Sequence, residues 1–265
     1  LYYYITLKKK MLQVLEKKSF LKYNTIRKNK GEKSMKKVGI VVAMEEEFEA
    51  VENRMKNIEV KQIYNLRFTL GKIGNKECIL VRSGVGKVNS ARTTQVMSDN
   101  FELEYIVNVG SAGSVNDSLN IGDVVIGKEV VQHDFDITAF GHSKGYITGV
   151  GNSVKCDEKL VKELNQMLES GPERNYTIKL GIVATGDIFC EDIAMKNKIR
   201  AKFNADVVDM ECSAIAQVAY LNDIPFIVIR SVSDTPDGKN ASTFDKNLKL
   251  ASKRCANLLE EFLKT

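Results

Sequence analysis

The stretch Asp206-Val-Val-Asp-Met-Glu-Cys-Ser-Ala-Ile-Ala216 decides the fold. It begins with Val207-Val208, typical of a buried strand, and continues with small residues at 213–219 that favour a helix. Two acids, Asp209 and Glu211, stand where the strand gives way to the helix. Open α/β sheets bind ligands at such junctions. Acids also suit the dipole of a first helical turn, so this stretch alone leaves both interpretations open.

Apolar runs and helical patterns alternate on both sides of this stretch. The continuous apolar run at 38–43 predicts a strand covered on both faces, and further strands are expected at 67–70, 78–81, 105–109, 123–131, 178–184 and 225–230. Helices are expected over about 45–55, 90–98, 157–168, 192–203 and 242–263, the last opened by a capping box at 242–245. The fold class is therefore α/β: residues 35–265 form a single domain with a central mixed twisted sheet flanked by helices on both sides.

Small residues follow several of the expected strands. Ser83-Gly84-Val-Gly86 is neither a P-loop nor a dinucleotide fingerprint, because Val81 and Asn89 stand where those motifs need glycine. Gly110-Ser111-Ala112-Gly113 is expected as a tight loop that admits a ligand close to backbone N–H groups, although ordinary turns look similar. Residues 231–236 are expected as a turn that carries hydroxyls and a carboxylate.

The charge of the chain is unevenly distributed. Residues 1–34 hold ten Lys or Arg and two acids, so the whole-chain net charge of +5 leaves −3 for the remainder. The body therefore lacks the basic footprint of a nucleic-acid-binding protein. The compositional break at Lys33-Ser34-Met35 predicts that 1–34 is a basic N-terminal extension, either disordered or a leader upstream of a start at Met35. A weak helical spacing in it leaves a surface helix as the alternative.

Cysteine and histidine usage argues against a metal site. The five cysteines are scattered without a C-x-x-C pair, and the two histidines form no H-E-x-x-H motif. We expect no metal and no cofactor. No apolar run is long enough to cross a membrane, and a reducing cytoplasm fits the cysteines.

Four signals together carry a family resemblance: Ala43-Met44-Glu45-Glu46-Glu47, Gly110-Ser111-Ala112-Gly113, Val208-Asp209-Met210-Glu211 and Arg230-Ser231-Val232-Ser233-Asp234. In this order and spacing the chain, from Met35 to Thr265, closely resembles the bacterial 5′-methylthioadenosine/S-adenosylhomocysteine nucleosidases of the purine nucleoside phosphorylase superfamily. The resemblance implies a nucleoside phosphorylase-like fold and hydrolysis of the bond between adenine and a 5′-thioribose.

The resemblance also implies roles for three acids. Asp234 would protonate the departing adenine, which requires a protonated carboxyl near neutral pH, favoured by desolvation or a nearby acid. Glu211 would hold the ribose hydroxyls and stabilise the cationic transition state. Glu47 would activate the attacking water with Ser111 and Arg230 in support. Ser233 and Arg230 would orient Asp234, whose competing interpretation is a turn-capping aspartate.

The remaining implied contacts surround the substrate. Phe189 would stack on adenine and the backbone of Cys190 would read its edge, whereas a core phenylalanine is the alternative. The resemblance places against the sugar and thio group the side chains of Met44, Val85, Met210 and Phe244, although Met44 is equally a core residue type. Phe140, in a loop of about fifteen residues that opens at His133, would cover the thio group of a neighbouring subunit, which implies a homodimer.

Three rival functions stay open. A nucleoside phosphorylase would need cationic or N–H-rich phosphate ligands, where this chain offers Glu45-Glu46-Glu47. The sequence poorly distinguishes a methylthioadenosine hydrolase from a hydrolase of another purine nucleoside, such as an aminofutalosine. A nucleoside-binding protein without catalysis would not need both Glu47 and Asp234. His142 and Thr148 replace a tyrosine and a proline of the best-known family members, which leaves the tolerance for 5′-thio groups open.

Overall fold

The computed structural model describes residues 35–235 and 244–265. Within it, Lys36–Thr265 form one compact unit. The prediction about residues 1–34 lies outside the described residues and stays a prediction. The elements follow one another as β1 (Lys37–Val42), α2 (Glu45–Glu52), β2 (Lys56–Ile63), β3 (Leu66–Ile73), β4 (Lys76–Arg82), α3 (Lys87–Asn100), β5 (Leu103–Ser114), β6 (Val124–Gln132), η1 (Thr138–Phe140), β7 (Val154–Lys155), α4 (Glu158–Ser170), β8 (Ile178–Thr185), α5 (Ile193–Phe203), β9 (Val207–Asp209), α6 (Cys212–Leu221), β10 (Phe226–Asp234) and α7 (Phe244–Phe262).

A mixed ten-stranded sheet forms the centre, as the sequence predicts. Its strand order is β10-β6-β8-β9-β5-β1-β4-β3-β2, with β7 beside β6 and a further pairing between β10 and β5. The pairs of β1 with β4 and β5 are parallel, whereas β3 is antiparallel to both β2 and β4. The β10–β5 pairing joins five strands, β5, β9, β8, β6 and β10, into a closed ring. This closure brings the carboxyl ends of β5 and β10 together.

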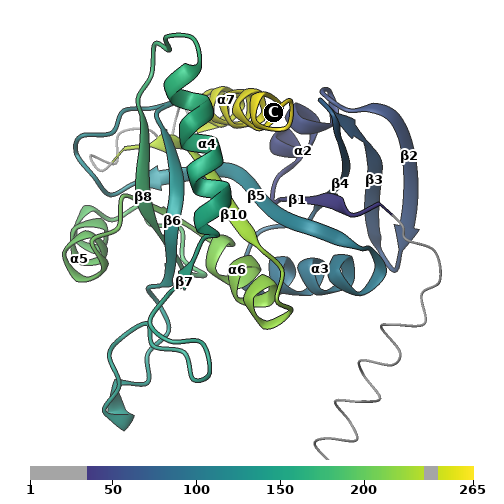
Figure 1. Cartoon of the computed structure of the whole chain (residues 1–265). Helices are drawn as coiled ribbons and strands as arrows, with labels where there is room; N and C mark the ends of the chain where they lie inside the picture. Colours follow the sequence, from purple (N-terminus) through teal and green to yellow (C-terminus); the bar gives the residue numbers. More distant parts are fainter. Residues whose placement is uncertain (1–34, 236–243) are drawn as a thin grey trace, which may run out of the picture. The chain divides into compact units, whose positions relative to one another are not determined.

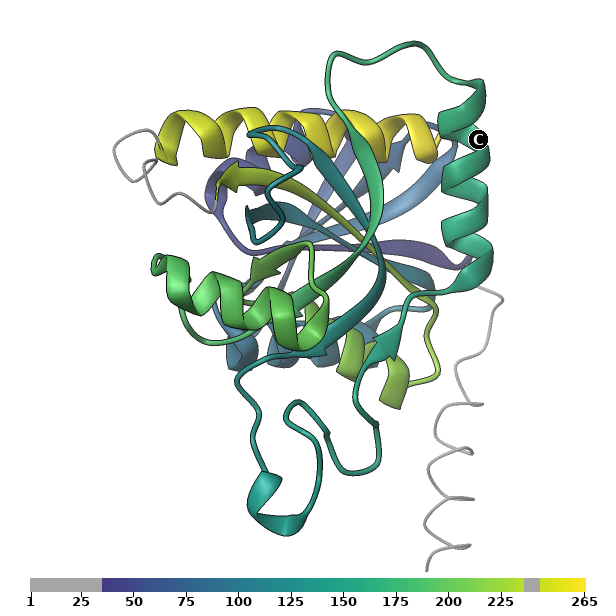
Figure 2. The ribbon, with the colours of Figure 1, turned by 90° about the vertical axis from the view of Figure 1, so that its left-hand side faces the viewer.

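Helices cover both faces of the sheet (Figures 1 and 2). Alternate residues of a strand point to opposite faces, and β5 shows this directly. Tyr105, Val107 and Val109 pack into a core cluster with α2, α4 and α7. Ile106 lies in a second cluster with α3 and α6. The small residues of α6 let it approach the strands closely, and Ile215 is fully buried there.

Two expected turns are instead parts of strands. Residues 110–113 continue β5, where Gly110 pairs with Arg230 and Ser111 with Ser231 of β10. Residues 231–234 continue β10, which is also antiparallel to β6. The prediction of loops at both places was wrong, because each segment satisfies the backbone hydrogen bonds of the other. The expected capping box at 242–245 falls largely outside the described residues.

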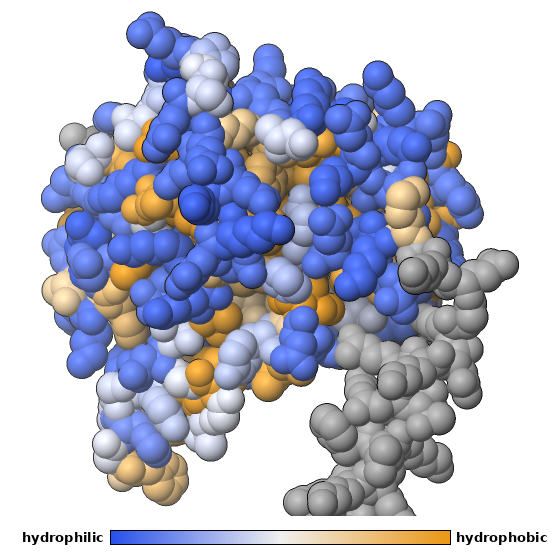
Figure 3. All heavy atoms as spheres, viewed as in Figure 1, coloured by the Kyte–Doolittle hydropathy of each residue, from blue (hydrophilic) through white to orange (hydrophobic). Residues whose placement is uncertain are grey.

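β2 is an element that the sequence analysis missed. Its residues are exposed along nearly the whole strand, since it lies at the edge of the sheet and pairs only with β3 among the described strands. The loop between β6 and β7 extends away from the sheet (Figure 1). Figure 3 shows that this face of the molecule is mainly hydrophilic, with a hydrophobic group at the end of that loop. No helix among the described residues has the length and apolarity that a bilayer crossing requires.

Candidate active site

A cavity of about 260 Å³ lies where β1, β5, β9 and β10 end. The lining comes from the strand ends and from the loops that precede α3 and α5. Its members are Ala43, Met44, Glu47, Val85, Ser111, Ala112, Gly113, Ile188, Phe189, Cys190, Val208, Asp209, Met210, Glu211, Ser233 and Asp234. Ten of the thirteen predicted site residues are among them. The three acids singled out in the sequence therefore share one cavity.

Glu47 is a buried carboxylate held from several sides. It lies on α2, one turn after β1 ends, so that its Oε2 accepts from the backbone N–H groups of Ala43 and Met44 at 2.9 and 3.0 Å. Its Oε1 accepts from the backbone N–H and the hydroxyl of Ser111 at 2.8 and 3.1 Å. Gly110 beneath it has no room for a side chain, because a Cβ there would meet both Glu47 and Arg230. These contacts fix the carboxylate against the cavity wall.

Glu211 lies at the N-terminus of α6 and is nearly fully buried. Its Oε1 accepts a hydrogen bond from the N–H of Gly86 at 2.9 Å, and Arg230 lies 3.8 Å from its Oε2. Gly86 has φ +100°, a conformation that favours glycine, and its backbone lies close to the carboxylate of Glu211. Burial, reinforced by the nearby Asp209, raises the pKa of Glu211 to about 7, although Arg230 opposes the shift.

A buried ion pair connects Asp209, which lines the cavity, with Arg230, which does not. Arg230 on β10 donates to Asp209 of β9 at 2.6 Å and to Asn108 of β5 at 2.7 Å. Asp209 also accepts from the N–H of Cys212, the first residue of α6, at 2.8 Å. Burial raises the pKa of Asp209, but Arg230 and these hydrogen bonds outweigh burial and lower it overall. Asp209, for which no chemical role was expected, connects β9 with α6 and with β10.

Asp234 ends β10 beside Gly113, where an added Cβ would lie 2.7 Å from its Oδ2. The hydroxyl of Ser233 lies 3.1 Å from its Oδ1. The ammonium of Lys196, on α5, donates to its Oδ2 at 2.9 Å. The expectation that Arg230 also orients Asp234 was wrong, because the guanidinium points to Asp209 instead.

Apolar side chains make up the rest of the wall. Met44 and Met210 are half-buried, and Val85 and Phe189 are exposed over about half of their surfaces. Cys190 is buried, and burial raises the pKa of its thiol to about 11, so the thiol carries no charge near neutral pH. The exposure of Phe189 contradicts the alternative of a core phenylalanine.

Three predicted residues do not line this cavity. Arg230 lies behind it, next to Glu47 over Gly110, where it can support the charge of Glu47. Phe140 lies in η1 on the loop between β6 and β7 and is 81% exposed. Phe244 begins α7, but its side chain lies outside the described residues.

The chain is similar to known proteins of one superfamily. Residues 37–264 match the sequence profile of the Phosphorylase superfamily. A 5′-methylthioadenosine/S-adenosylhomocysteine nucleosidase from Bacillus cytotoxicus is 36% identical over 86% of this chain and 98% of its own length. The corresponding nucleosidase from Geobacillus sp. is 38% identical over 84% of this chain and 96% of its own length. The chain belongs to the 5′-methylthioadenosine/S-adenosylhomocysteine nucleosidase family.

Solved structures of this nucleosidase family share the fold. The Neisseria meningitidis nucleosidase in complex with methylthio-immucillin-A aligns with a TM-score of 0.82, with 32% identity over 87% of this chain and 99% of that chain. The Colwellia psychrerythraea nucleosidase in complex with adenine aligns with a TM-score of 0.81, with 32% identity over 87% of this chain and 95% of that chain. The nucleoside phosphorylase-like fold expected from the sequence is confirmed.

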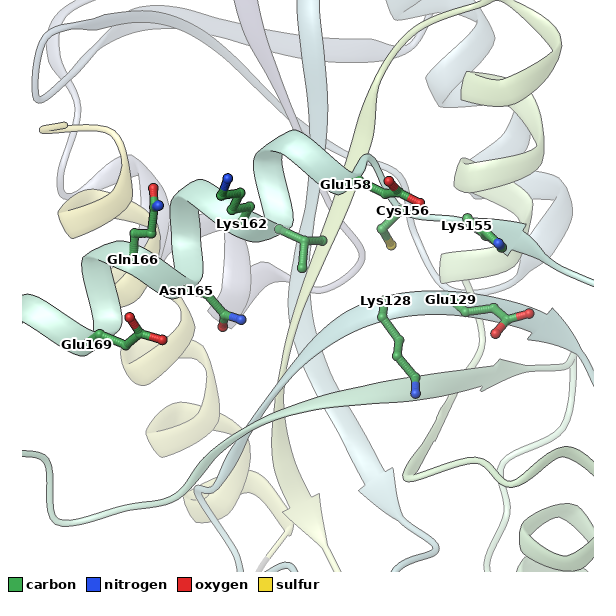
Figure 4. Close-up of a pocket in the computed structure, with 10 residues that line it drawn as sticks. Lys128, Glu129, Lys155, Cys156, Glu158, Lys162, Asn165, Gln166 and Glu169 are labelled. Atoms are coloured by element: carbon green, nitrogen blue, oxygen red, sulfur yellow. The ribbon is translucent and has the colours of Figure 1, made fainter.

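A second hollow, of about 600 Å³, is larger than the cavity of the acids but differs in character. It lies between α4 and the strands β6 and β7 (Figure 4). Its lining includes three lysines and three glutamates, whose charges offset one another, and none of the residues predicted for a nucleosidase site. The smaller cavity, which combines acids with an apolar wall, is therefore the candidate active site.

Two residues at or next to the cavity, Ile188 and Lys196, were not expected from the sequence. Ile188, beside Phe189, lines the cavity, and its place in an irregular segment offered no periodic signal. Lys196 is buried and paired with Asp234, which lies 38 positions away, so spacing gave no sign of it. No cluster of three or more His, Cys, Asp or Glu suited to a metal ion occurs among the described residues.

Proposed function

We propose that this protein hydrolyses the N-glycosidic bond of 5′-methylthioadenosine and S-adenosylhomocysteine, and also of 5′-deoxyadenosine, releasing adenine and the sugar. One observation carries the proposal: Glu47, Glu211 and Asp234 line a single cavity that also has an apolar wall. Loss of a purine leaves an oxocarbenium-like ribose. The reaction therefore needs a protonated leaving group, a stabilised cation and a positioned water, and the cavity offers one acid for each.

Asp234 is assigned to the leaving group. Protonation at N7 lets adenine leave as a neutral molecule, and Asp234 lines the same cavity as Phe189 and Cys190. Phe189 would stack on the purine, and the backbone of Cys190 would read its edge. Ser233, within hydrogen-bond distance of Oδ1, would orient the carboxyl.

Glu211 is assigned to the ribose. Its two oxygens can accept from the 2′- and 3′-hydroxyls, and its negative charge favours the cationic transition state. Met210 would lie against the sugar. Met44, Val85 and Phe244 would cover the sugar and the 5′-thio group.

Glu47 is assigned to the attacking water. Ser111 and the N–H groups of Ala43 and Met44 hold its oxygens, so that the carboxylate can orient a water and accept its proton. Arg230, beside it over Gly110, supports the charge.

The assembly and setting belong to the same proposal. Phe140 would reach the site of a neighbouring subunit in a homodimer, which its exposure on an extended loop supports. The protein would act in the cytoplasm, in methionine salvage and recycling of the methyl cycle. All five cysteines are free, which fits a reducing compartment.

Adenine release from methylthioadenosine in phosphate-free buffer tests the proposal. Among the described residues, the cavity wall carries four carboxylates and no lysine or arginine, so phosphate would be repelled. We expect the same rate with and without phosphate. A strict phosphate requirement would make the protein a phosphorylase. Binding of methylthioadenosine without release of adenine would make it a binding protein. Faster release from a nucleoside that lacks the 5′-thio group, such as an aminofutalosine, would assign it another substrate.

A further inference from the structure

Lys196 is among the largest fully buried side chains of the described residues, although lysine is rarely buried without a specific partner. It lies on α5, on the face that packs toward the sheet together with Ile199. Its ammonium donates to Asp234 Oδ2 and to the carbonyl oxygen of Thr235, both at 2.9 Å. The lysine therefore binds two consecutive residues at the point where β10 ends.

Burial of this charge is costly, so its position calls for an explanation. An ammonium ion removed from water is stabilised only by close acceptors of good geometry, and breaking such a pair destabilises a protein strongly. Lys196 does not line the substrate cavity, whereas Asp234, which it contacts, does. Its place fits a group that acts on Asp234 and not on the substrate.

The contacts of Asp234 show what Lys196 contributes. Gly113 and Ser233 confine the carboxyl on the sides of β5 and β10, whereas Lys196 holds Oδ2 from α5. The segment between Ile188 and Cys190, which carries the proposed adenine contacts, precedes the same helix. The ion pair thus ties the leaving-group acid to the element that presents the purine wall.

We propose that Lys196 is a positioning residue for the departure of adenine, acting through Asp234. It orients the carboxyl and brings the proton that the carboxyl passes on. As the C1′–N9 bond breaks, its electron pair goes to the purine. The proton leaves Lys196 as its N–H bond breaks, passes through the carboxylate of Asp234 by an O–H bond that forms and then breaks, and ends in a new N–H bond at N7. Asp234 is then a carboxylate again and Lys196 is a neutral amine. The amine regains a proton from solvent after release. This inference rests on the proposed function.

Lys196→Met tests the proposal, with Lys198→Met as the matched control because Lys198 is an exposed lysine of the same helix. For methylthioadenosine we expect kcat of Lys196→Met to fall about 10²-fold, which is the loss of rate that misplacement of a catalytic group causes. KM should stay within a few-fold of the wild-type value. The second substrate is the 5′-methylthio riboside of p-nitrophenol. Its leaving group departs as a stable phenolate without a proton, so Lys196→Met should keep nearly the wild-type rate on it.

A double variant isolates the coupling. If Lys196 acts through Asp234, Lys196→Met/Asp234→Asn should be no slower than Asp234→Asn alone, because the two changes remove one function. Equal loss on both substrates, additive losses in the double variant, or an unchanged kcat in Lys196→Met would each overturn the proposal. If Lys196→Met does not fold, Lys196→Gln provides the same comparison with a neutral side chain that can still donate. Failure of the wild-type protein to release adenine would refute the proposed function instead.

Discussion

Glu47 and Glu46 are neighbours in sequence but differ in what surrounds them. Glu47 is buried and accepts four hydrogen bonds in the cavity wall, whereas Glu46 is half-buried and does not line the cavity. We expect Glu47→Gln to lower kcat for adenine release about 10³-fold, since an amide cannot accept the proton of water. Binding of methylthioadenosine, measured by titration, should change little. Glu46→Gln is the control and should keep the wild-type rate; comparable losses in both variants would contradict the role of Glu47.

The raised pKa of Glu211 predicts how kcat/KM of the enzyme depends on pH. Burial, with Asp209, raises its pKa to about 7, so the carboxyl is protonated below that pH and cannot accept from both ribose hydroxyls. We expect kcat/KM for methylthioadenosine to rise with pH through about 7. The raised pKa also affects the free energy of unfolding, but this quantity falls with pH where kcat/KM rises. The folded state binds the Glu211 proton more tightly than the unfolded state, so the group stabilises the fold fully below pH 4.5. This contribution is lost as the pH rises to about 7.

The pH profile of Glu211→Gln checks this assignment. Its residual kcat/KM should be low and should no longer change near pH 7. If kcat/KM of the variant still changes near pH 7, another group titrates there, and this result would contradict the assignment to Glu211.

At the scale of elements, Asp209 connects its own strand, β9, with β10 and with α6. It accepts from Arg230 of β10 and from the first residue of α6, with both ionic side chains only 1% exposed. Asp209→Asn leaves the guanidinium without its carboxylate, which costs about 3–5 kcal/mol in other buried pairs. Denaturant unfolding should show this loss. Glu45→Gln is the control, because it breaks the exposed pair with Arg82, and should cost less than about 1 kcal/mol. Equal effects would mean that the buried pair does not stabilise the fold.

The elements also show how far sequence patterns reach. The apolar run at 105–109 predicted β5, but its small-residue continuation, Gly110 to Gly113, looked like a turn. A Cβ at Gly110 would meet Glu47 and Arg230, and a Cβ at Gly113 would meet Asp234, and only tertiary packing reveals this need for glycine. β2 was missed for a different reason. An exposed edge strand buries no face, so it lacks the apolar alternation that identifies a strand.

At the scale of the molecule, the site was predictable where a motif carried it. Glu47, Glu211 and Asp234 stand in short recognisable segments, and closure of the sheet between β5 and β10 brings those segments to one cavity. Lys196 and the ion pair of Asp209 were not predictable, because each depends on which side chain of a helix or strand faces a distant partner. Hydrophobic periodicity predicts which face of a helix or strand is buried, but not which distant side chain that face contacts.

The exposed side chain of Phe140 leads to a prediction about the oligomeric state. It is 81% exposed at the end of an extended loop and outside the cavity lining. If it covers the 5′-thio group of a neighbouring subunit, Phe140→Ala should raise KM for methylthioadenosine at least 10-fold, because burying a phenylalanine side chain is worth about 1.5–3 kcal/mol. KM for adenosine, which lacks the thio group, should change less. Sedimentation of the wild-type protein should show a dimer.

Mixing two impaired variants decides which subunit Phe140 serves. Glu47→Gln lacks the water-activating carboxylate but keeps the aromatic loop, and Phe140→Ala has the converse defect. In a mixed dimer, the site with an intact Glu47 receives Phe140 from its neighbour, so the high KM of the Phe140→Ala protein should return toward the wild-type value for that site. If Phe140 covered the site of its own subunit, every site of the mixture would lack one of the two groups. Mixtures as impaired as the separate variants, despite subunit exchange shown by a tagged subunit, would therefore contradict the shared site.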